Sequence, residues 1–133
     1  MIDYATLKDV NAAINDLPYT AGVDPLWEPI DLDADGGTCS NFAVAKYRAL
    51  RARGWDKESL ILTCAFVEPS AAPEKRDRYH AILVVKHEGK LLAMDNRKPY
   101  PTEVEFLPYE WHKLWSHALN NWEWAEGADR AFS

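Results

Sequence analysis

The sequence of 133 residues has little of several features that mark particular protein classes. Its two cysteines, Cys39 and Cys64, are too few and too differently placed for a disulfide framework. No hydrophobic run is long enough to cross a bilayer, and the N-terminus has an acidic residue, Asp3, and no apolar stretch typical of a signal peptide. These absences predict a protein of the reducing cytoplasm.

Positive charge is also scarce. The chain has 15 Lys and Arg against 21 Asp and Glu, a formal net charge of −6, whereas nucleic-acid binding relies on clustered Lys and Arg. The one basic cluster, Arg48 to Arg53, precedes Gly54 at the end of a predicted helix, where positive side chains compensate the helix dipole. We expect neither nucleic acid nor a membrane as partner. The length and the 47% hydrophobic content predict one soluble domain over residues 1–133.

The spacing of apolar residues predicts an α+β fold. Helices are expected from Tyr4 to Leu17 and from Cys39 to Arg53, because apolar residues recur at helical spacing in both segments. Residues 59–67 form a short apolar run that predicts a buried strand, in which Cys64 has a structural role. Residues 79–86 and 90–95 flank a glycine turn and predict a β-hairpin.

The expected hairpin brings together two polar side chains. With residues 88 and 89 as the loop, Ile82 faces Asp95, and His80 projects from the same face as Ile82. Diagonal neighbours of this kind lie about 7–8 Å apart at the backbone, within reach of longer side chains. The pairing therefore puts an imidazole and a carboxylate on one side of the sheet, whereas a one-residue slip would turn Asp95 to the other side.

Cys39 follows Gly36 and Gly37 and lies in the first turn of the second expected helix. Unpaired backbone N–H groups and the helix dipole favour an anion there, so the thiol loses its proton more easily and becomes reactive. A nucleophilic cysteine needs a base and a group that orients the base, and His80 and Asp95 supply these residue types. Each of the three also has a structural interpretation: a buried thiol, a hydrogen-bonded core histidine and a turn-forming aspartate.

The segment between the two expected helices has two features with open roles. Asp31, Asp33 and Asp35 match the first half of a calcium loop, but the twelfth position is Phe42, which cannot bind calcium. We therefore predict no metal and no other cofactor, and calcium bound by this acidic segment is the alternative. Trp27 either walls a substrate-binding cleft or caps the core beneath the loop.

The aromatic tail beyond Pro108 is predicted to be partly helical. Trp111, Trp115, Ala118 and Trp122 fall on one face at helical spacing. Such a stripe is typical of a core or of a cover over the sheet, and a protein-binding patch is the alternative.

Three segments together resemble the bacterial transglutaminase-like cysteine peptidases, which include periplasmic proteases that release biofilm adhesins. They are the run from Gly37 to Tyr47, the strand His80-Ala81-Ile82-Leu83-Val84, and Met94-Asp95-Asn96. Trp27-Glu28-Pro29 and residues 109–115 also match, so the resemblance spans roughly residues 25 to 116. It implies a papain-like, transglutaminase-like core with a nucleophile helix packed on an antiparallel sheet. Cys39 would be the nucleophile, His80 the base and Asp95 its orienting partner.

The chain also departs from that family. In the calcium-dependent adhesin proteases an Asp precedes the cysteine and a Glu follows it, and both help to bind the metal, whereas here Thr38 and Ser40 occupy these positions. Calcium control by that route is therefore not expected. The missing export signal disfavours a periplasmic adhesin as the target and is compatible with a phage-encoded protein that acts in the host cell.

The leading functional hypothesis is a cysteine peptidase or amidase that hydrolyses a peptide or isopeptide bond of a protein or peptide substrate. The triad of Cys39, His80 and Asp95 would act through a thioester, and the N–H of Cys39 would help to hold the oxyanion. Trp27 is the candidate for substrate binding. Two alternatives remain: transglutaminase or deamidase chemistry on glutamine with the same residues, and a catalytically silent protein-binding module on the same fold.

Overall fold

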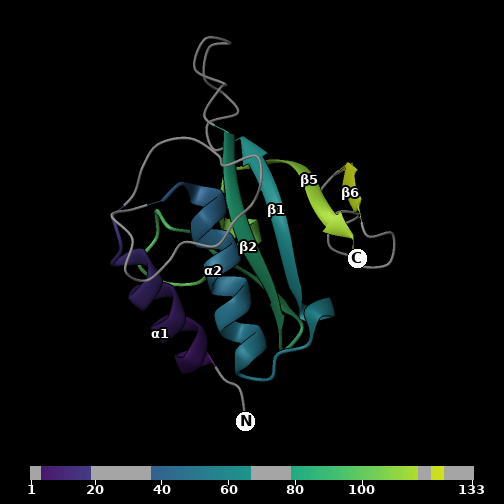
Figure 1. The fold of residues 1–133 in the computed structure, drawn as a ribbon. Coiled ribbons are helices and arrows are strands. Elements are labelled where there is room, and N and C mark those ends of the chain that lie inside the picture. The colour runs from purple at the N-terminus through teal and green to yellow at the C-terminus, as the bar shows by residue number, and fades with distance from the viewer. Residues whose placement is uncertain (1–3, 19–36, 67–78, 117–120, 125–133) are drawn as a thin grey trace.

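A computed structural model describes residues 4–18, 37–66, 79–116 and 121–124 of the chain (Figure 1). Two helices precede the six described strands; the short 3-10 helix η1 lies between α2 and β1, and a second one, η3, lies between β4 and β5. In chain order the elements are α1 (Tyr4–Asn15), α2 (Cys39–Ala52), η1 (Lys57–Ser59), β1 (Leu60–Phe66), β2 (Tyr79–His87), β3 (Lys90–Met94), β4 (Thr102–Glu103), η3 (Val104–Phe106), β5 (Glu110–Ser116) and β6 (Asn121–Trp124).

The strands form one antiparallel sheet of six in the order β4-β3-β2-β1-β5-β6. Helix α2 packs against β2 at the centre of the sheet and α1 packs beside α2, whereas β5 and β6 extend the sheet away from the helices (Figure 1). This arrangement confirms the predicted α+β fold with a helix on an antiparallel sheet.

The central strand β2 is apolar on both faces because each face contacts its own hydrophobic cluster. Leu83 and Val85 belong to the cluster between the sheet and the helices, together with Leu7, Val10 and Phe42. Ile82 and Val84 belong to the cluster on the opposite face. Since side chains alternate along a strand, His80 is expected on the face of Ile82, away from the helices.

Local sequence signals fix the ends of α2. Thr38 is the N-cap, and its backbone N–H donates to Asn41 Oδ1 at 2.8 Å, so the amide side chain takes the place usually held by Glu or Gln in a capping box. At the other end, Gly54 adopts a φ of 94°, the left-handed conformation that favours glycine after a helix.

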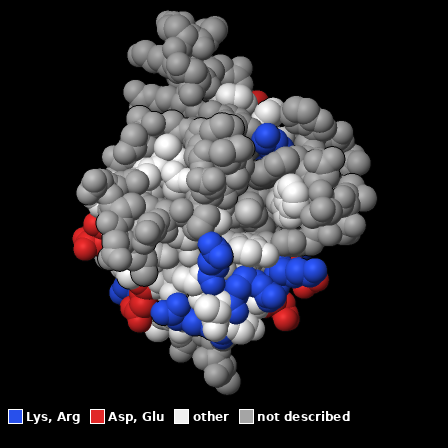
Figure 2. Space-filling model, in the orientation of Figure 1, with Lys and Arg blue, Asp and Glu red and all other residues white. Residues whose placement is uncertain are grey.

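Basic side chains gather over the C-terminal part of α2, on the face seen in Figure 2. Arg51 donates to the carbonyl of Trp55 at 2.7 Å, and Arg53 donates to the carbonyl of Ala49 at 3.2 Å. Both contacts satisfy carbonyl oxygens at or just beyond the end of the helix, as the interpretation of this cluster as dipole compensation requires.

The β2–β3 hairpin has the predicted register. His87 pairs with Lys90 and Val85 pairs with Leu92. The two loop residues, Glu88 and Gly89, both have positive φ, at 51° and 77°, as a two-residue turn of type I′ requires. Because the turn sets the register, it also decides which face the residues near the far ends of the two strands occupy.

The predicted helix in the aromatic tail is wrong: residues 110–116 and 121–124 form β5 and β6. Trp111 lies opposite Ala65 of β1 and packs against the cluster on the face away from the helices. The spacing of Trp111 and Trp115 is typical of a helix face, but the register between β1 and β5 shifts between Cys64 and Ala65, so Trp111 shares its cluster with Leu114. Hydrogen-bonded pairing with β1 makes residues 110–116 a strand.

Candidate active site

Cys39 is the first residue of α2 and only 1% of it is exposed. Strand β3 ends at Met94, opposite Leu83, so the part of β2 that precedes Leu83 has no pairing with β3. There the Cys39 Sγ accepts a hydrogen bond of 3.3 Å from the backbone N–H of Ala81. The thiol therefore reaches the middle strand of the sheet at the position next to His80, and is not enclosed by hydrocarbon alone.

His80 and Asp95 form a buried pair. The His80 Nε2 lies 2.6 Å from Asp95 Oδ1, and the two residues are 3% and 0% exposed. Asp95 directly follows the last residue of β3, and its backbone opens a turn in which the N–H of Lys98 donates to the Asp95 carbonyl at 3.2 Å. The diagonal placement expected from the hairpin is therefore present, and the carboxylate contacts the ring directly.

Two further donors hold the carboxylate. The backbone N–H of Arg97 donates to Asp95 Oδ1 at 2.8 Å, and the hydroxyl of Tyr109 donates to Oδ2 at 2.5 Å. Hydrogen bonds to the ionised form stabilise a carboxylate. Although burial works in the opposite direction, the contacts with His80, Tyr109 and Arg97 lower the pKa of Asp95 to about 2.

The electrostatics of the ring follow from its two neighbours. Burial tends to lower the pKa of His80, but hydrogen bonds with Asp95 and Cys39, and the negative charges of both, outweigh it and raise this pKa to about 9. Because Nε2 faces Asp95, Nδ1 is the ring nitrogen that remains for the bond with Cys39. The imidazole thus lies between a thiol and a carboxylate, and it is protonated at neutral pH.

The structure brings Cys39, His80 and Asp95 together, and it also adds residues that the sequence did not single out. Tyr109 contacts the Asp95 carboxylate, and the fully buried Lys46 donates to the carbonyl of Met94, next to Asp95. Lys46 lies seven positions after Cys39 on an otherwise apolar helix face. This spacing, two helical turns, was the available signal for its place near the site.

Cys64 lies inside β1 and is 1% exposed, in agreement with its expected structural role. Neither Cys39 nor Cys64 forms a disulfide in the described structure. Trp27, the candidate for substrate binding, lies outside the described residues. Among the helices that the structure describes, none has the length and apolar character needed to cross a membrane.

Thr38 and Ser40, on either side of Cys39, do not fit the calcium site of the calcium-dependent adhesin proteases. The hydroxyls of Thr38 and Ser40 are hydrogen-bonded to each other at 3.0 Å, and Thr38 Oγ1 also bonds Asn41 Oδ1 at 2.9 Å. Calcium is bound by six to eight oxygens, many of them from carboxylates, and neither Thr38 nor Ser40 carries a carboxylate. Asp31, Asp33 and Asp35 lie outside the described residues, so the predicted lack of a metal stays a prediction.

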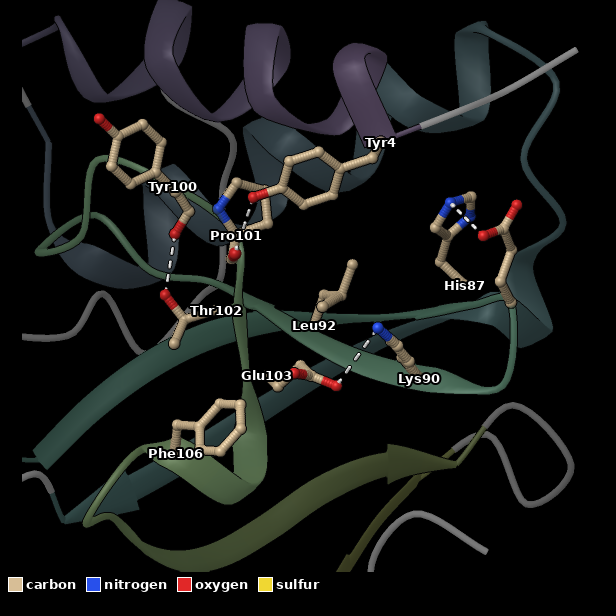
Figure 3. Close-up of a pocket in the computed structure, with 10 residues that line it drawn as sticks. Tyr4, His87, Lys90, Leu92, Tyr100, Pro101, Thr102, Glu103 and Phe106 are labelled. Carbon is tan, nitrogen blue, oxygen red and sulfur yellow. Dashed lines mark hydrogen bonds and ion pairs between the residues drawn. The ribbon is translucent and has the colours of Figure 1, made fainter.

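A pocket of about 480 Å³ lies elsewhere, between the start of α1, the tip of the β2–β3 hairpin and η3 (Figure 3). Tyr4, Tyr100 and Phe106 line it, with the ion pair of Lys90 and Glu103 at its side. Cys39, His80 and Asp95 do not line this pocket. It is therefore separate from the candidate active site.

Solved structures share this fold. LapG of Legionella pneumophila in its EGTA-treated form is 21% identical, with a TM-score of 0.68 over 91% of this chain and 66% of that chain. A second structure of the same protein, at 21% identity, gives a TM-score of 0.68 over 93% of this chain and 70% of that one. The calcium-bound form is 22% identical, with a TM-score of 0.66 over 91% and 68%. The chain thus spans about two thirds of the length of these structures. At such identities the likeness concerns the fold alone.

A search of curated proteins finds no match. A family model described as bacterial transglutaminase-like cysteine proteinase matches residues 3–130, nearly the whole sequence. This match confirms the resemblance drawn from the motifs around Cys39, His80 and Asp95. The chain belongs to the bacterial transglutaminase-like cysteine proteinases, a family of cysteine peptidase-like hydrolases.

Proposed function

We propose that this chain hydrolyses an amide bond of a protein or peptide, with Cys39 as nucleophile, His80 as acid and base, and Asp95 as the group that orients His80. The observation that carries the proposal is the placement of the His80 ring, whose Nε2 lies 2.6 Å from the buried Asp95 carboxylate while the ring also bonds Cys39. A structural histidine needs hydrogen bonds, but it does not need a thiol at the start of a helix as one partner.

In the first half of the reaction the Cys39 thiolate attacks the carbonyl carbon and a C–S bond forms. The carbonyl oxygen becomes an oxyanion, which collapses as the C–N bond breaks. The His80 imidazolium donates its proton to the leaving amine, so that a neutral amine and a thioester result. The raised pKa of His80, about 9, keeps this proton available at neutral pH.

In the second half, water attacks the thioester carbonyl while neutral His80 accepts a proton from the water. The C–S bond then breaks, the acid product leaves, and the thiolate and imidazolium are restored. Asp95 stays ionised throughout, because its pKa of about 2 is far below that of the imidazolium. Its role is to hold the ring and to stabilise the positive charge.

Negative charge on the sulfur and on the oxyanion has two sources of stabilisation. The first turn of α2 presents backbone N–H groups and the positive end of the helix dipole, and the N–H of Cys39 belongs to this turn. The N–H of Ala81 already donates to the sulfur at 3.3 Å. Both groups are backbone donors on rigid elements, which is the arrangement that costs least reorganisation during the reaction.

The silent binding module is the alternative that one observation favours, since only 1% of Cys39 is exposed. Native alkylation distinguishes the two. Iodoacetamide should modify Cys39 and not the equally buried Cys64, and the rate should change by less than about threefold between pH 6 and 8. An ordinary thiol with a pKa near 8.5 would react roughly 75 times faster at the upper pH, because its ionised fraction rises that much. Cys64→Ala should label like the wild type.

Labelling of Cys39 only after denaturation would contradict the proposal and favour the module. If Cys39 is reactive, incubation with a peptide library, with and without a primary amine, identifies the acceptor of the acyl group. New peptide termini are the expected product, and Cys39→Ala should form none. Amine-linked or deamidated glutamine without any cleavage would instead assign transglutaminase or deamidase chemistry, which uses the same thioester.

A further inference from the structure

Lys46 is the one lysine of the described chain that is buried completely, with 0% of it exposed. It lies on α2, and its Nζ donates to Asn11 Oδ1 of α1 at 2.8 Å and to the carbonyl of Met94 at the end of β3 at 2.9 Å. Lysine is almost never buried without a partner, because removing an ammonium group from water is strongly unfavourable. Packing between α1, α2 and the sheet would be served as well by an apolar residue.

Side chains of the two helices α1 and α2 bind the short backbone segment that carries Asp95. The amide of Asn11 donates to the carbonyl of Lys98 at 3.1 Å. The amide of Asn15 donates to the carbonyls of Asp95 and Lys98, each at 3.1 Å. With the bond from Lys46 to Met94, side chains of both helices hold the backbone on either side of the candidate orienting residue. This segment must stay in place if the Asp95 carboxylate is to remain 2.6 Å from the His80 ring.

Without the Lys46 ammonium group, the charged groups of the candidate site would have a net negative charge. Asp95 is the charged group that acts on Lys46 from the end of β3, and beyond Asp95 lie His80 of β2 and Cys39 at the start of α2. The side chains that α1 presents, Asn11 and Asn15, are neutral. A thiolate, a carboxylate and one imidazolium sum to −1 in a buried site, and an ammonium brings the sum to zero.

We propose that Lys46 is a positioning residue for the Cys39 reaction, whose ammonium group fixes the strand end before Asp95 and supplies the positive charge that balances the carboxylate and the thiolate. The inference rests on the proposed function. Two opposing effects set the pKa of Lys46: burial lowers it to about 7, while the negative charge of Asp95 acts to raise it. Its charge at neutral pH therefore depends on the anions beside it.

The test compares two neutral variants, Lys46→Met and Lys46→Gln, of which the second keeps a donor for the Met94 carbonyl. The readouts are the rate of Cys39 alkylation and the thiolate absorbance near 240 nm, both as a function of pH. Without the positive charge, the carboxylate and the thiolate repel each other more strongly. The acidic limb, which is the low-pH part of each profile where the thiolate forms, should therefore shift to higher pH by about one unit or more. Alkylation on that limb should then be at least tenfold slower.

Two controls separate charge from mechanical support. Asn15→Ala removes bonds to the Asp95 segment without touching Lys46, so it should lower the alkylation rate and leave the acidic limb in place. Lys90→Met removes a lysine that is 63% exposed at its side chain and 3.9 Å from Glu103. This variant should match the wild type in both readouts.

A folded neutral variant of Lys46 with an unmoved acidic limb would overturn the inference. If neither variant folds, the ¹⁵N shift of the Lys46 Nζ in the wild-type protein decides, and a neutral amine at pH 7 with reactive Cys39 would overturn it. An unreactive Cys39 in the native wild type would instead count against the proposed function. The two failures are therefore distinguishable.

Discussion

Asp95→Asn offers the most direct measure of how the site is organised. The amide has the shape of the carboxylate, and its oxygen can still accept a hydrogen bond from His80 Nε2, so ring orientation and fold should persist. What disappears is the negative charge. Hydrogen bonding and charge from Asp95 are among the causes that raise the pKa of His80 to about 9, whereas burial acts to lower it. We therefore expect the pKa of His80 in this variant to fall from about 9 toward its ordinary value of 6.5, because only the hydrogen bond and the charge of Cys39 then oppose burial.

The size of the effect follows from that difference. The interval between about 9 and 6.5 corresponds to about 3 kcal/mol of stabilisation of the imidazolium by its surroundings. If the pKa falls to 6.5, the protonated fraction of His80 at pH 7 drops from about 0.99 to about 0.25, which alone slows donation to the leaving amine about fourfold. If the Cys39 thiolate loses the same amount of stabilisation as the His80 imidazolium, the rate of Cys39 alkylation falls by two to three powers of ten. Lower pH should restore part of the turnover.

The assay is an NMR titration of the His80 ring, with the alkylation rate of Cys39 measured over the same pH range. Tyr109→Phe is the matched control, because it removes the other side-chain contact of Asp95, at 2.5 Å, and leaves the carboxylate in place. His80 should keep a raised pKa in that variant. A pKa of His80 that stays near 9 in Asp95→Asn would refute the reasoning, since the source of the shift would then lie outside the pair.

Two further predictions concern stability and metal. His80 stabilises the fold below pH 6.5 and this contribution is lost as pH rises to about 9, whereas that of Asp95 is present above pH 3.8 and lost as pH falls to about 2. Lys46 has the opposite sign to His80 and favours the fold increasingly from about pH 7 toward 10.5, so urea unfolding should show a steeper loss above pH 7 in Lys46→Met than in the wild type. Because Thr38 and Ser40 provide no carboxylate beside Cys39, EGTA should change the alkylation rate and the Tm little; a loss that calcium restores would contradict this.

The parts of the site that were predictable from sequence are those set by local rules. A two-residue turn at Glu88 and Gly89 fixes the hairpin register, and the register puts His80 and Asp95 on one face. The glycine pair and the helical spacing after Cys39 place the thiol in a first helical turn. Neither rule shows that α2 meets β2 at Ala81, which is a matter of packing between distant segments.

The parts that were missed depend on contacts across the fold. Lys46 looks like a solvent-exposed helix residue until α1 is packed beside α2 and encloses it. Tyr109 reaches Asp95 from the segment just before β5, the strand whose pairing with β1 shifts register between Cys64 and Ala65. Spacing alone could not reveal that irregularity, and it also misassigned the tail as a helix.

In the proposed reaction, the causes of the His80 shift explain how one ring would serve as acid and then as base. Two of them, the hydrogen bond with Cys39 and the negative charge on its sulfur, exist only while the thiol is free. Once the sulfur carries the acyl group it is a neutral thioester, so both causes vanish and the pKa of His80 falls toward neutrality. Asp95 then remains as its partner, with burial opposing it. In the proposed mechanism, acylation itself would therefore convert a proton donor into a proton acceptor at constant pH, as the hydrolysis of the thioester requires.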